Sequence, residues 1–518
     1  MKTSTGKEIP EKPVSLADSV AFVDDRIYVV KSKAFDSVFL SWYQRCRAID
    51  NDIRMATEEA DAVAKYLAQE KSAQPKTSQA IHVDDAINME KARALLVKVA
   101  SYGASDMHLL IRETHAEVQV RIKSALRLLE KMSVNEGKLL ERTLFQGFAS
   151  SKDASFKPQE YQNAQIDGAD VHPVLTGIRM VRGPCYPMEK NGSFVIARFQ
   201  YVSSRITAPN PHGALPYPAR PNKESLQLNH LGYTDTQVMD LVNMVESTAG
   251  IILVTGPTGS GKTTLLNEMM KRHAYTYPEL RQVTIEDPIE YPMPWAVQLP
   301  ITNAANEDAT ADAFSERLRT ALRMDPDCIL LGEVRGAGSA LAALNAAMTG
   351  HLVFATLHTS DPYMAIDRME LMDPIRLNRK ITCDHRLVLG LIAQRLLPKL
   401  CPHCKQPFNP DKVFPSMVEK LAAWGDVTDM HEKGTGCDAC SGDGYVSRFA
   451  VGEVVSTNSE FMTIFIKDGG DAARKYMRYR EGFGGSMLFN TMRHVCTGEV
   501  SPYDIRMAAT LMRPGEET

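Results

Sequence analysis

Residues 250–264, GIILVTGPTGSGKTT, place a glycine-rich octet between a short apolar run and the start of a helical pattern. The octet, Gly256 to Thr263, fits the phosphate-binding pattern G-x-x-x-x-G-K-[S/T]. Glycines allow backbone N–H groups to curl around phosphate oxygens, and the N-terminus of the helix adds positive potential. A glycine-rich turn without a ligand is the alternative, which the flanking strand and helix patterns disfavour.

We therefore predict a nucleotide site made of the loop and the start of its helix. Its residues are Gly256, Pro257, Thr258, Gly259, Ser260, Gly261, Lys262, Thr263 and Thr264. In such a site the lysine, Lys262, reaches the β- and γ-phosphates, and the hydroxyl of Thr263 holds Mg²⁺.

Four apolar runs around this loop predict an α/β domain with a parallel sheet. They are rich in Ile, Val and Leu, as suits parallel strands buried on both faces, and helical patterns separate them. The runs are GIILVTG (250–256), RQVTIED (281–287), CILLGEV (328–334) and HLVFATLH (351–358). Ligands of such sheets bind beyond the carboxyl ends of the strands, which is where each run ends in polar residues.

Two of these strand ends offer carboxylates, and ATP hydrolysis needs one to orient the attacking water and help hold magnesium. Glu286 and Asp287 follow one run, and Glu333 follows another. Many P-loop ATPases end the second of these strands with an acidic pair, whereas this chain has Gly332 before Glu333. We expect Glu286 to replace the missing acid. A solvated strand-end cap is the alternative for such a residue.

Four cysteines form a second candidate site. Cys401, Cys404, Cys437 and Cys440 follow the spacing C-x₂-C-x₃₂-C-x₂-C. Four thiolates suit tetrahedral Zn²⁺, and a closed set of four ligands leaves no position for an activated water, so we predict a structural zinc. A redox-active C-x-x-C is the alternative, but one pair would suffice for it. The other five cysteines are expected to be free thiols.

Composition limits the remaining choices. The 518-residue chain is 44% apolar and 24% charged, with a net charge of −4, which excludes disordered and fibrous classes. That charge offers no overall footprint for nucleic acid. The polar N-terminus lacks an apolar signal segment, and no apolar run reaches the ~18 residues of a membrane span. We expect a cytoplasmic protein with, at most, peripheral membrane contact.

Further along the chain, changes of pattern predict four regions. Residues 1–83 hold a strand hairpin at 19–30, a helical stretch to about Leu67 and a polar linker at 69–80. Residues 84–205 begin with a helix and continue with alternating strands, an α+β pattern. Residues 206–225 hold five prolines and predict an extended linker. Residues 226–518 hold the α/β domain, with the metal module at about 395–450.

Four blocks, taken in order, resemble the secretion ATPase family of type II secretion and type IV pilus assembly motors. They are GPTGSGKTT (256–264), TIEDPIEY (284–291), LRMDPDCILLGEVR (322–335) and TGHLVFATLHT (349–359). In that family they are the Walker A motif, the aspartate box, the Walker B motif and the histidine box. The resemblance implies a P-loop, RecA-like ATPase core preceded by a smaller, PAS-like α+β domain.

The resemblance also implies roles for single residues. Glu333 would activate the water, Glu286 would help order magnesium and water, and His351 and His358 would sense the γ-phosphate. Taken alone, each histidine would be a core or strand-end residue. GASDMHLLI (103–111), GIRMV (177–181) and VIARF (195–199) resemble segments of the smaller domain.

The arginines of the last two segments, Arg179 and Arg198, become candidate arginine fingers through this resemblance. Ordinary surface salt bridges are the alternative for both. A mobile guanidinium group that completes a site would couple hydrolysis to domain closure.

Two features of the sequence indicate which kind of motor within this family the chain resembles. Gly336 and Gly338 stand where the family carries Asp and Glu, and Ser360 stands where Asn is usual. The cysteine module is typical of extension and secretion motors rather than retraction motors. The short N-terminal region and the Walker B departures favour a type IV pilus motor, with the plasmid-borne thin-pilus kind as one candidate, over a type II secretion motor.

By resemblance, the chain is expected to work as a homo-oligomer, a hexameric ring, that hydrolyses ATP with Mg²⁺ and carries Zn²⁺. It would act on an inner-membrane platform protein to drive pilin or pseudopilin assembly, without binding nucleic acid. A DNA-transfer or pilus retraction motor is one alternative. A nucleotide-gated assembly scaffold with little hydrolysis is the other.

Overall fold

The computed structural model describes residues 10, 12–13, 16, 18–23, 25–50, 52–73, 78–152, 155–202, 215–301 and 307–516. The chain forms two compact units, residues 1–87 and 88–518. Residues 206–214 of the predicted proline-rich linker lie outside the described residues, as does Asp24 in the predicted hairpin turn. The boundaries predicted at 205 and 225 stay predictions.

The first unit contains a small sheet with helices. Its elements are β1 (Val20–Val23), β2 (Arg26–Val30), α1 (Ser37–Ile49), β3 (Arg54–Glu58) and α2 (Ala60–Ala73). The antiparallel pair β1–β2 confirms the predicted hairpin. Phe39, Trp42 and Cys46 on one face of α1 are fully buried in the core of this unit.

The helical pattern predicted up to about Leu67 was wrong in part. Residues 54–58 form β3, which pairs in parallel with β2, because α1 ends at Ile49 and returns the chain to the sheet edge. The predicted polar linker at 69–80 was also wrong in part, since α2 extends to Ala73 and α3 (Ser78–Ser101) begins at Ser78.

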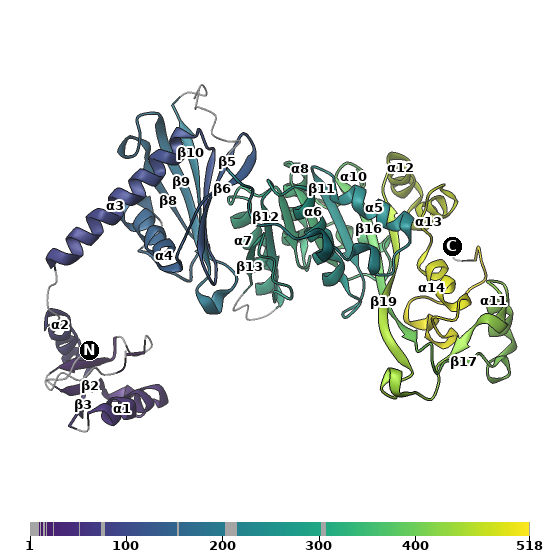
Figure 1. Cartoon of the computed structure of the whole chain (residues 1–518), viewed down its shortest axis with the longest axis horizontal. Helices are drawn as coiled ribbons and strands as arrows, with labels where there is room; N and C mark the ends of the chain where they lie inside the picture. The colour runs from purple at the N-terminus through teal and green to yellow at the C-terminus, as the bar shows by residue number, and fades with distance from the viewer. Residues whose placement is uncertain are drawn as a thin grey trace. The chain divides into compact units, whose positions relative to one another are not determined.

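The second unit begins with a seven-stranded sheet in which every neighbouring pair is antiparallel, called here the antiparallel sheet (Figure 1). In spatial order its strands are β6 (Ala125–Met132), β5 (Ala116–Ile122), β4 (Asp106–Ile111), β10 (Ser193–Tyr201), β9 (Leu175–Pro184), β8 (Gln162–Asp167) and β7 (Ala149–Lys152). Helices α3 and α4 (Val134–Arg142) cover one face. From the other face, Leu110, Phe194 and Ile196 join the hydrophobic core of the sheet that follows.

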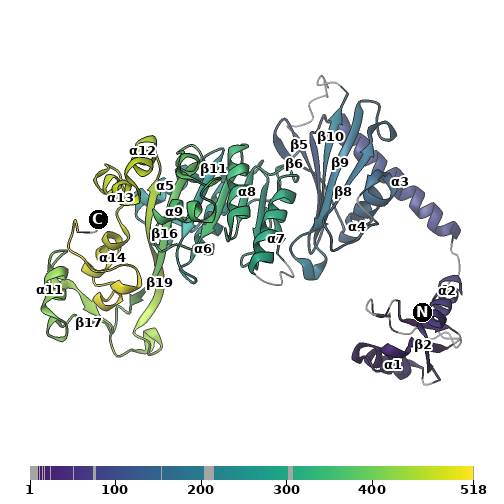
Figure 2. The same ribbon diagram turned by 180° about the vertical axis from the view of Figure 1, so that it is seen from behind.

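A second seven-stranded sheet, called the mixed sheet, carries the glycine-rich loop (Figure 2). In spatial order its strands are β13 (Val297–Pro300), β12 (Gln282–Glu286), β14 (Cys328–Leu331), β15 (Leu352–Leu357), β11 (Gly250–Thr255), β16 (Val388–Leu400) and β19 (Tyr445–Ser456). All neighbours are parallel except β16 and β19. The four predicted parallel strands are thus confirmed as β11, β12, β14 and β15.

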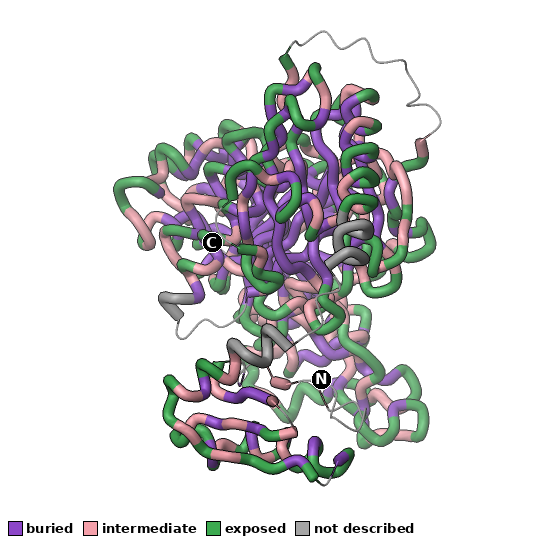
Figure 3. Tube along the Cα trace, turned by 90° about the vertical axis from the view of Figure 1, so that its left-hand side faces the viewer, coloured by how far each residue is buried: buried purple, intermediate pink, exposed green. Residues whose placement is uncertain are grey.

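Helices cover this sheet and extend beyond it. They are α5 (Asp235–Val245), α6 (Lys262–Thr276), α7 (Glu307–Ala321), α8 (Ala337–Met348), α9 (Met364–Met372), α10 (Arg379–Thr382), α11 (Pro415–Ala422), α12 (Ser459–Asp468), α13 (Gly470–Tyr479) and α14 (Met487–Cys496). The interior strands are largely buried (Figure 3), as expected for a parallel sheet covered on both faces. Among the described residues, no helix has both the length and the apolar character that crossing a bilayer requires.

Candidate nucleotide site and metal centre

The glycine-rich loop leaves the carboxyl end of β11 and enters α6 at Lys262. Gly256, Gly259 and Gly261 all have positive φ, of 147°, 77° and 84°. A Cβ on Gly256 would lie 2.6 Å from the Ser260 hydroxyl oxygen and 2.7 Å from the carbonyl oxygen of Gln394. The loop therefore needs glycine both for its backbone angles and for its close approach to β16, and its curled backbone fits the predicted phosphate cradle.

Two buried residues that were not predicted from the sequence, Gln394 and Tyr233, support the loop. The Gln394 side chain on β16 donates from Nε2 to the Ser260 carbonyl oxygen at 2.7 Å, and its Oε1 accepts from the Tyr233 hydroxyl. Burial raises the pKa of that tyrosine, so its hydroxyl remains a donor. A glutamine inside an otherwise apolar strand was the signal that could have identified this contact.

Lys262 lies at the mouth of the loop. Its Nζ donates to the carbonyl oxygens of Gly256 at 2.7 Å and Pro257 at 2.9 Å. Burial lowers the pKa of the ammonium group, because the low-dielectric surroundings disfavour its charge. The side chain lies next to the backbone that would surround a phosphate.

Glu333 and His358 come together, because they follow the neighbouring parallel strands β14 and β15. His358 Nε2 lies 3.1 Å from Glu333 Oε1, and Arg335 Nε donates to the other carboxylate oxygen at 2.5 Å. Arg335 also lies 4.0 Å from Asp287 Oδ2. Two cationic or hydrogen-bonding partners thus orient the carboxylate predicted to act on water.

Glu286 is 3% exposed at the end of β12. Its Oε1 accepts hydrogen bonds from Thr284 and, at 3.1 Å, from Gln298 Nε2. Burial raises the pKa of this carboxyl group, and the two hydrogen bonds oppose the rise. The loop residues from Thr258 to Thr264, Glu286, Glu333 and His358 all line one cleft of about 830 Å³.

Two arginines that the sequence analysis did not propose also line this cleft. Arg335 is the partner of Glu333, and Arg368 projects from α9 as an exposed residue. Arg335 ends the Walker B block and Arg368 follows the histidine box by nine residues, and neither position by itself indicates the cleft.

His351 and His358 lie at opposite ends of β15. His351 precedes β15, whereas His358 follows it, so six strand residues of about 3.3 Å each separate the two histidines. Its carbonyl accepts from Gly250 N at the start of β11, and its Nδ1 lies 2.9 Å from the Ala346 carbonyl oxygen. His351 therefore lies at the amino edge of the sheet and caps the end of α8. Its role as a sensor of the γ-phosphate stays a prediction.

Arg179 and Arg198 are direct cross-strand partners on β9 and β10, and neither lines the cleft. Arg198 is 58% exposed and pairs with Asp106 at 2.9 Å and with Asp325 at 3.2 Å. Arg179 and Arg198 instead line a separate hollow of about 400 Å³ with Arg323. The structure shows the salt bridges of Arg198, and the role of both residues as arginine fingers stays a prediction.

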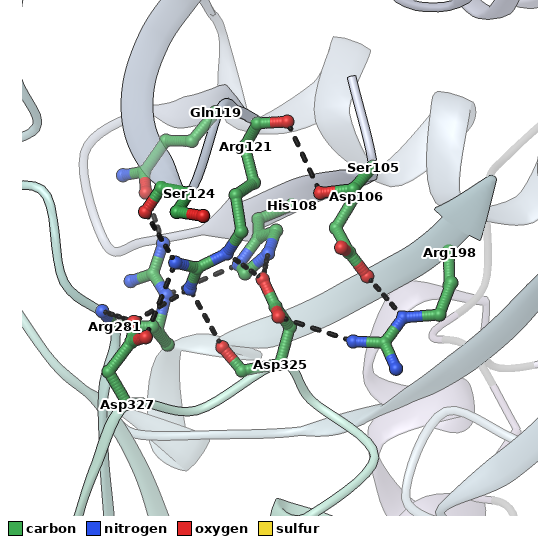
Figure 4. A network of polar contacts seen from close by, with 10 residues as sticks. All are labelled: Ser105, Asp106, His108, Gln119, Arg121, Ser124, Arg198, Arg281, Asp325 and Asp327. Carbon is green, nitrogen blue, oxygen red and sulfur yellow. Dashed lines mark hydrogen bonds and ion pairs between the residues drawn. The ribbon is translucent and has the colours of Figure 1, made fainter. Parts of the chain in front are cut away.

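Asp325 belongs to a charged network that joins the antiparallel sheet to the mixed sheet (Figure 4). Its carboxylate contacts Arg121 and lies 3.2 Å from His108 Nε2. His108 is fully buried, and burial lowers its pKa to about 4, so it is a neutral member of the network. Arg121 also pairs with Asp327 at 2.7 Å, just before β14. The GASDMH segment thus lies against the LRMDPD segment.

One of the departures from the family motif after Glu333, Gly338, lies against a side chain of α7. A Cβ on Gly338 would lie 2.8 Å from the Ser315 hydroxyl oxygen on α7. A side chain at this position would therefore require the Ser315 hydroxyl to turn away.

The four cysteines of the predicted metal module converge. Their Sγ atoms all lie within 4.8 Å of one another, with 3.7 Å between Cys401 and Cys437 and 3.8 Å between Cys404 and Cys440. The backbone N–H of Gly444 donates to Cys440 Sγ at 3.1 Å. Four clustered sulfurs without a disulfide fit a tetrahedral zinc site, and an N–H donor to a thiolate is the expected outer contact.

The fold and the cleft define a P-loop protein of the α/β class. The model of the family described as "Type II/IV secretion system protein" matches residues 219–507. The chain belongs to this family.

Curated relatives agree with that assignment. The type II secretion system protein HxcR of Pseudomonas aeruginosa is 32% identical over 73% of this chain and 68% of its own length. The type IV pilus assembly ATPase PilB of Thermus thermophilus is 28% identical over 82% of this chain. The matched part spans only 43% of the length of that protein. Among solved structures, the pilus retraction motor PilT with bound ADP aligns with 21% identity and a TM-score of 0.40, over 80% of this chain and 96% of that one.

Proposed function

We propose that this chain is an ATPase motor that drives the assembly of pilin or pseudopilin subunits. The arrangement of Lys262, Glu286, Glu333 and His358 around one cleft is the observation that carries the proposal. Relatives that are named as type IV pilus assembly and type II secretion proteins support the biological setting.

In the proposed mechanism, the loop N–H groups and Lys262 bind the β- and γ-phosphates of ATP. Glu333, held by Arg335 and His358, accepts a hydrogen bond from the attacking water and orients it toward the γ-phosphorus. Thr263 and Glu286 are the candidates to hold Mg²⁺, which when bound would neutralise charge on the phosphate oxygens. His358 can respond to loss of the γ-phosphate because it contacts the Glu333 carboxylate that orients the water.

The proposal extends to the assembly in which the chain works. We place it as a homo-oligomer, a hexameric ring, at the cytoplasmic side of the inner membrane, where it acts on a membrane platform protein. Movement of the antiparallel sheet relative to the mixed sheet would transmit the work of hydrolysis, with Arg179 and Arg198 as candidate fingers. The cysteine quartet would hold a structural Zn²⁺ that orders residues around 401–444.

A phosphate-release assay on the full chain with ATP and Mg²⁺ tests the proposal. Glu333→Gln keeps the size of the side chain but removes the negative charge that orients water, so we expect release to fall about 100-fold. ATP binding should remain, since Lys262 and the loop are unchanged. Glu460→Gln, on α12 and outside the cleft, is the matched control and should hydrolyse ATP at the normal rate.

Equal phosphate release by the wild type and Glu333→Gln would contradict the catalytic role of this carboxylate. ATP binding without measurable release in the wild type, alone and in the assembled ring, would favour the nucleotide-gated scaffold instead.

A further inference from the structure

A buried glutamine on the edge strand of the mixed sheet contacts Glu286. Gln298 on β13 is 2% exposed and lies opposite Thr284 in the parallel register with β12. Residues two apart on a strand share one face, so Gln298 faces the side that carries Thr284 and Glu286. Its Nε2 donates to Glu286 Oε1 at 3.1 Å.

The same amide also holds the loop that follows Glu286. Nε2 donates to the carbonyl oxygen of Tyr291 at 3.0 Å, and Oε1 accepts from the backbone N–H of Met293 at 2.7 Å. The Tyr291 hydroxyl in turn lies 2.9 Å from Thr264 Oγ1, one residue after Thr263 on α6. A continuous set of contacts therefore links Glu286, through Gln298 and Tyr291, to the start of the phosphate-binding helix.

Two residues that follow strands of the antiparallel sheet donate to the backbone of β13 and of the residue before it. Tyr186 N donates to the Gln298 carbonyl oxygen at 2.9 Å, and Arg112 Nη1 donates to the Ala296 carbonyl oxygen at 2.9 Å. β13 is the edge strand, with β12 as its only strand partner in the mixed sheet. Residues just beyond two strands of the antiparallel sheet thus supply partners to the backbone of the edge strand that carries Gln298.

We propose that Gln298 is the positioning residue for Glu286, which it aligns with the phosphate-binding helix. This proposal rests on the proposed function, because Glu286 orders magnesium and water only if the chain hydrolyses ATP. A buried carboxylate with one fewer donor would turn away from the cleft, and a displacement of about 1 Å in a catalytic group costs up to about 100-fold in rate. Gln298 itself does not line the cleft, so substrate binding should change little.

The test replaces Gln298 with Met, which has a similar length but neither donates nor accepts strongly. We expect kcat for ATP hydrolysis to fall between about 10- and 100-fold, with KM for ATP within about twofold of the wild type. Gln298→Leu is the second variant, because it removes the donors to Glu286 and Tyr291 without adding charge beside Glu286. It should show the same fall in kcat.

Gln282→Met is the matched control. Gln282 is a buried glutamine on the neighbouring strand β12, hydrogen-bonded to Met270, His273 and Trp295, and it has no contact with Glu286. Gln282→Met should lower thermal stability by about as much as Gln298→Met does. Its kcat should stay near that of the wild type. An equal fall in kcat for the folded Gln282 and Gln298 variants would overturn the proposal.

Hydrogen exchange gives a readout that does not depend on hydrolysis. The amide of Met293 should exchange at least about 10-fold faster in Gln298→Met, because its acceptor is lost, while amides of β12 keep their protection. Unchanged exchange at Met293 would contradict the positioning contact. If the wild type fails to hydrolyse ATP yet exchange at Met293 changes as expected, the proposed function fails and the contact stands. If the wild type hydrolyses ATP and Gln298→Met matches it, the positioning role fails alone.

Discussion

Lys262→Ala is expected to lower the affinity for ATP about 1000-fold and to abolish measurable hydrolysis. The ammonium group lies at the mouth of the loop, 2.7 Å and 2.9 Å from two loop carbonyl oxygens. From there it can turn to phosphate oxygens without moving the backbone. Two charge-assisted contacts at about 2 kcal/mol each amount to about 4 kcal/mol, which is close to three powers of ten in affinity.

Titration with a fluorescent ATP analogue in the presence of Mg²⁺ measures this effect. Lys271→Ala is the matched control, because Lys271 lies on the same helix but pairs with Glu268 outside the cleft. That variant should bind the analogue like the wild type. Retention of normal affinity by a folded Lys262→Ala protein would show that the loop is not the phosphate site.

Cys437→Ser is expected to remove the bound zinc, one equivalent per chain, and to unfold the residues around the cysteine quartet. A structural zinc contributes on the order of 10 kcal/mol or more to the fold that it closes. Serine is a poor ligand for this ion, and the three remaining sulfurs leave the tetrahedral set incomplete. Metal analysis of the purified protein gives the stoichiometry, and limited proteolysis reports the local unfolding.

Cys496→Ser supplies the control for the loss of a thiol. Cys496 is a partly buried free cysteine on α14 that lies outside the metal cluster. It should retain the full equivalent of zinc. Metal retained at one equivalent in Cys437→Ser would contradict a four-cysteine site, and the absence of zinc from the wild type would contradict the site altogether.

Sequence patterns were most informative where local chemistry repeats closely. The glycine loop, the apolar strands around it and the paired C-x-x-C motifs each combine residue types that few other structures need. The structure confirms the strands as β11, β12, β14 and β15 and brings the four sulfurs together. The strand β3 was missed because its sequence, RMATE, is short and largely exposed, and such a strand depends on its partner rather than on its own pattern.

The ends of elements were harder to assign to a function. His351 and His358 are equally close to the apolar run between them, so a motif cannot say which end of the strand meets the ligand. The parallel direction of β15 and β11 decides it, because the loop leaves the carboxyl end and only His358 lies there. Arg198 likewise has two charged partners, Asp106 and Asp325, that lie 92 and 127 residues away along the chain.

By itself, the sequence determined that this chain has a phosphate loop, a buried parallel sheet and a four-cysteine module, because each depends on residues whose spacing along the chain is short or regular. Only the tertiary structure decided which acids and histidines share the cleft. It also decided that Gln394 supports the loop and that Gln298 holds Glu286. Such contacts join segments far apart in sequence, and their geometry exists only after the strands have paired.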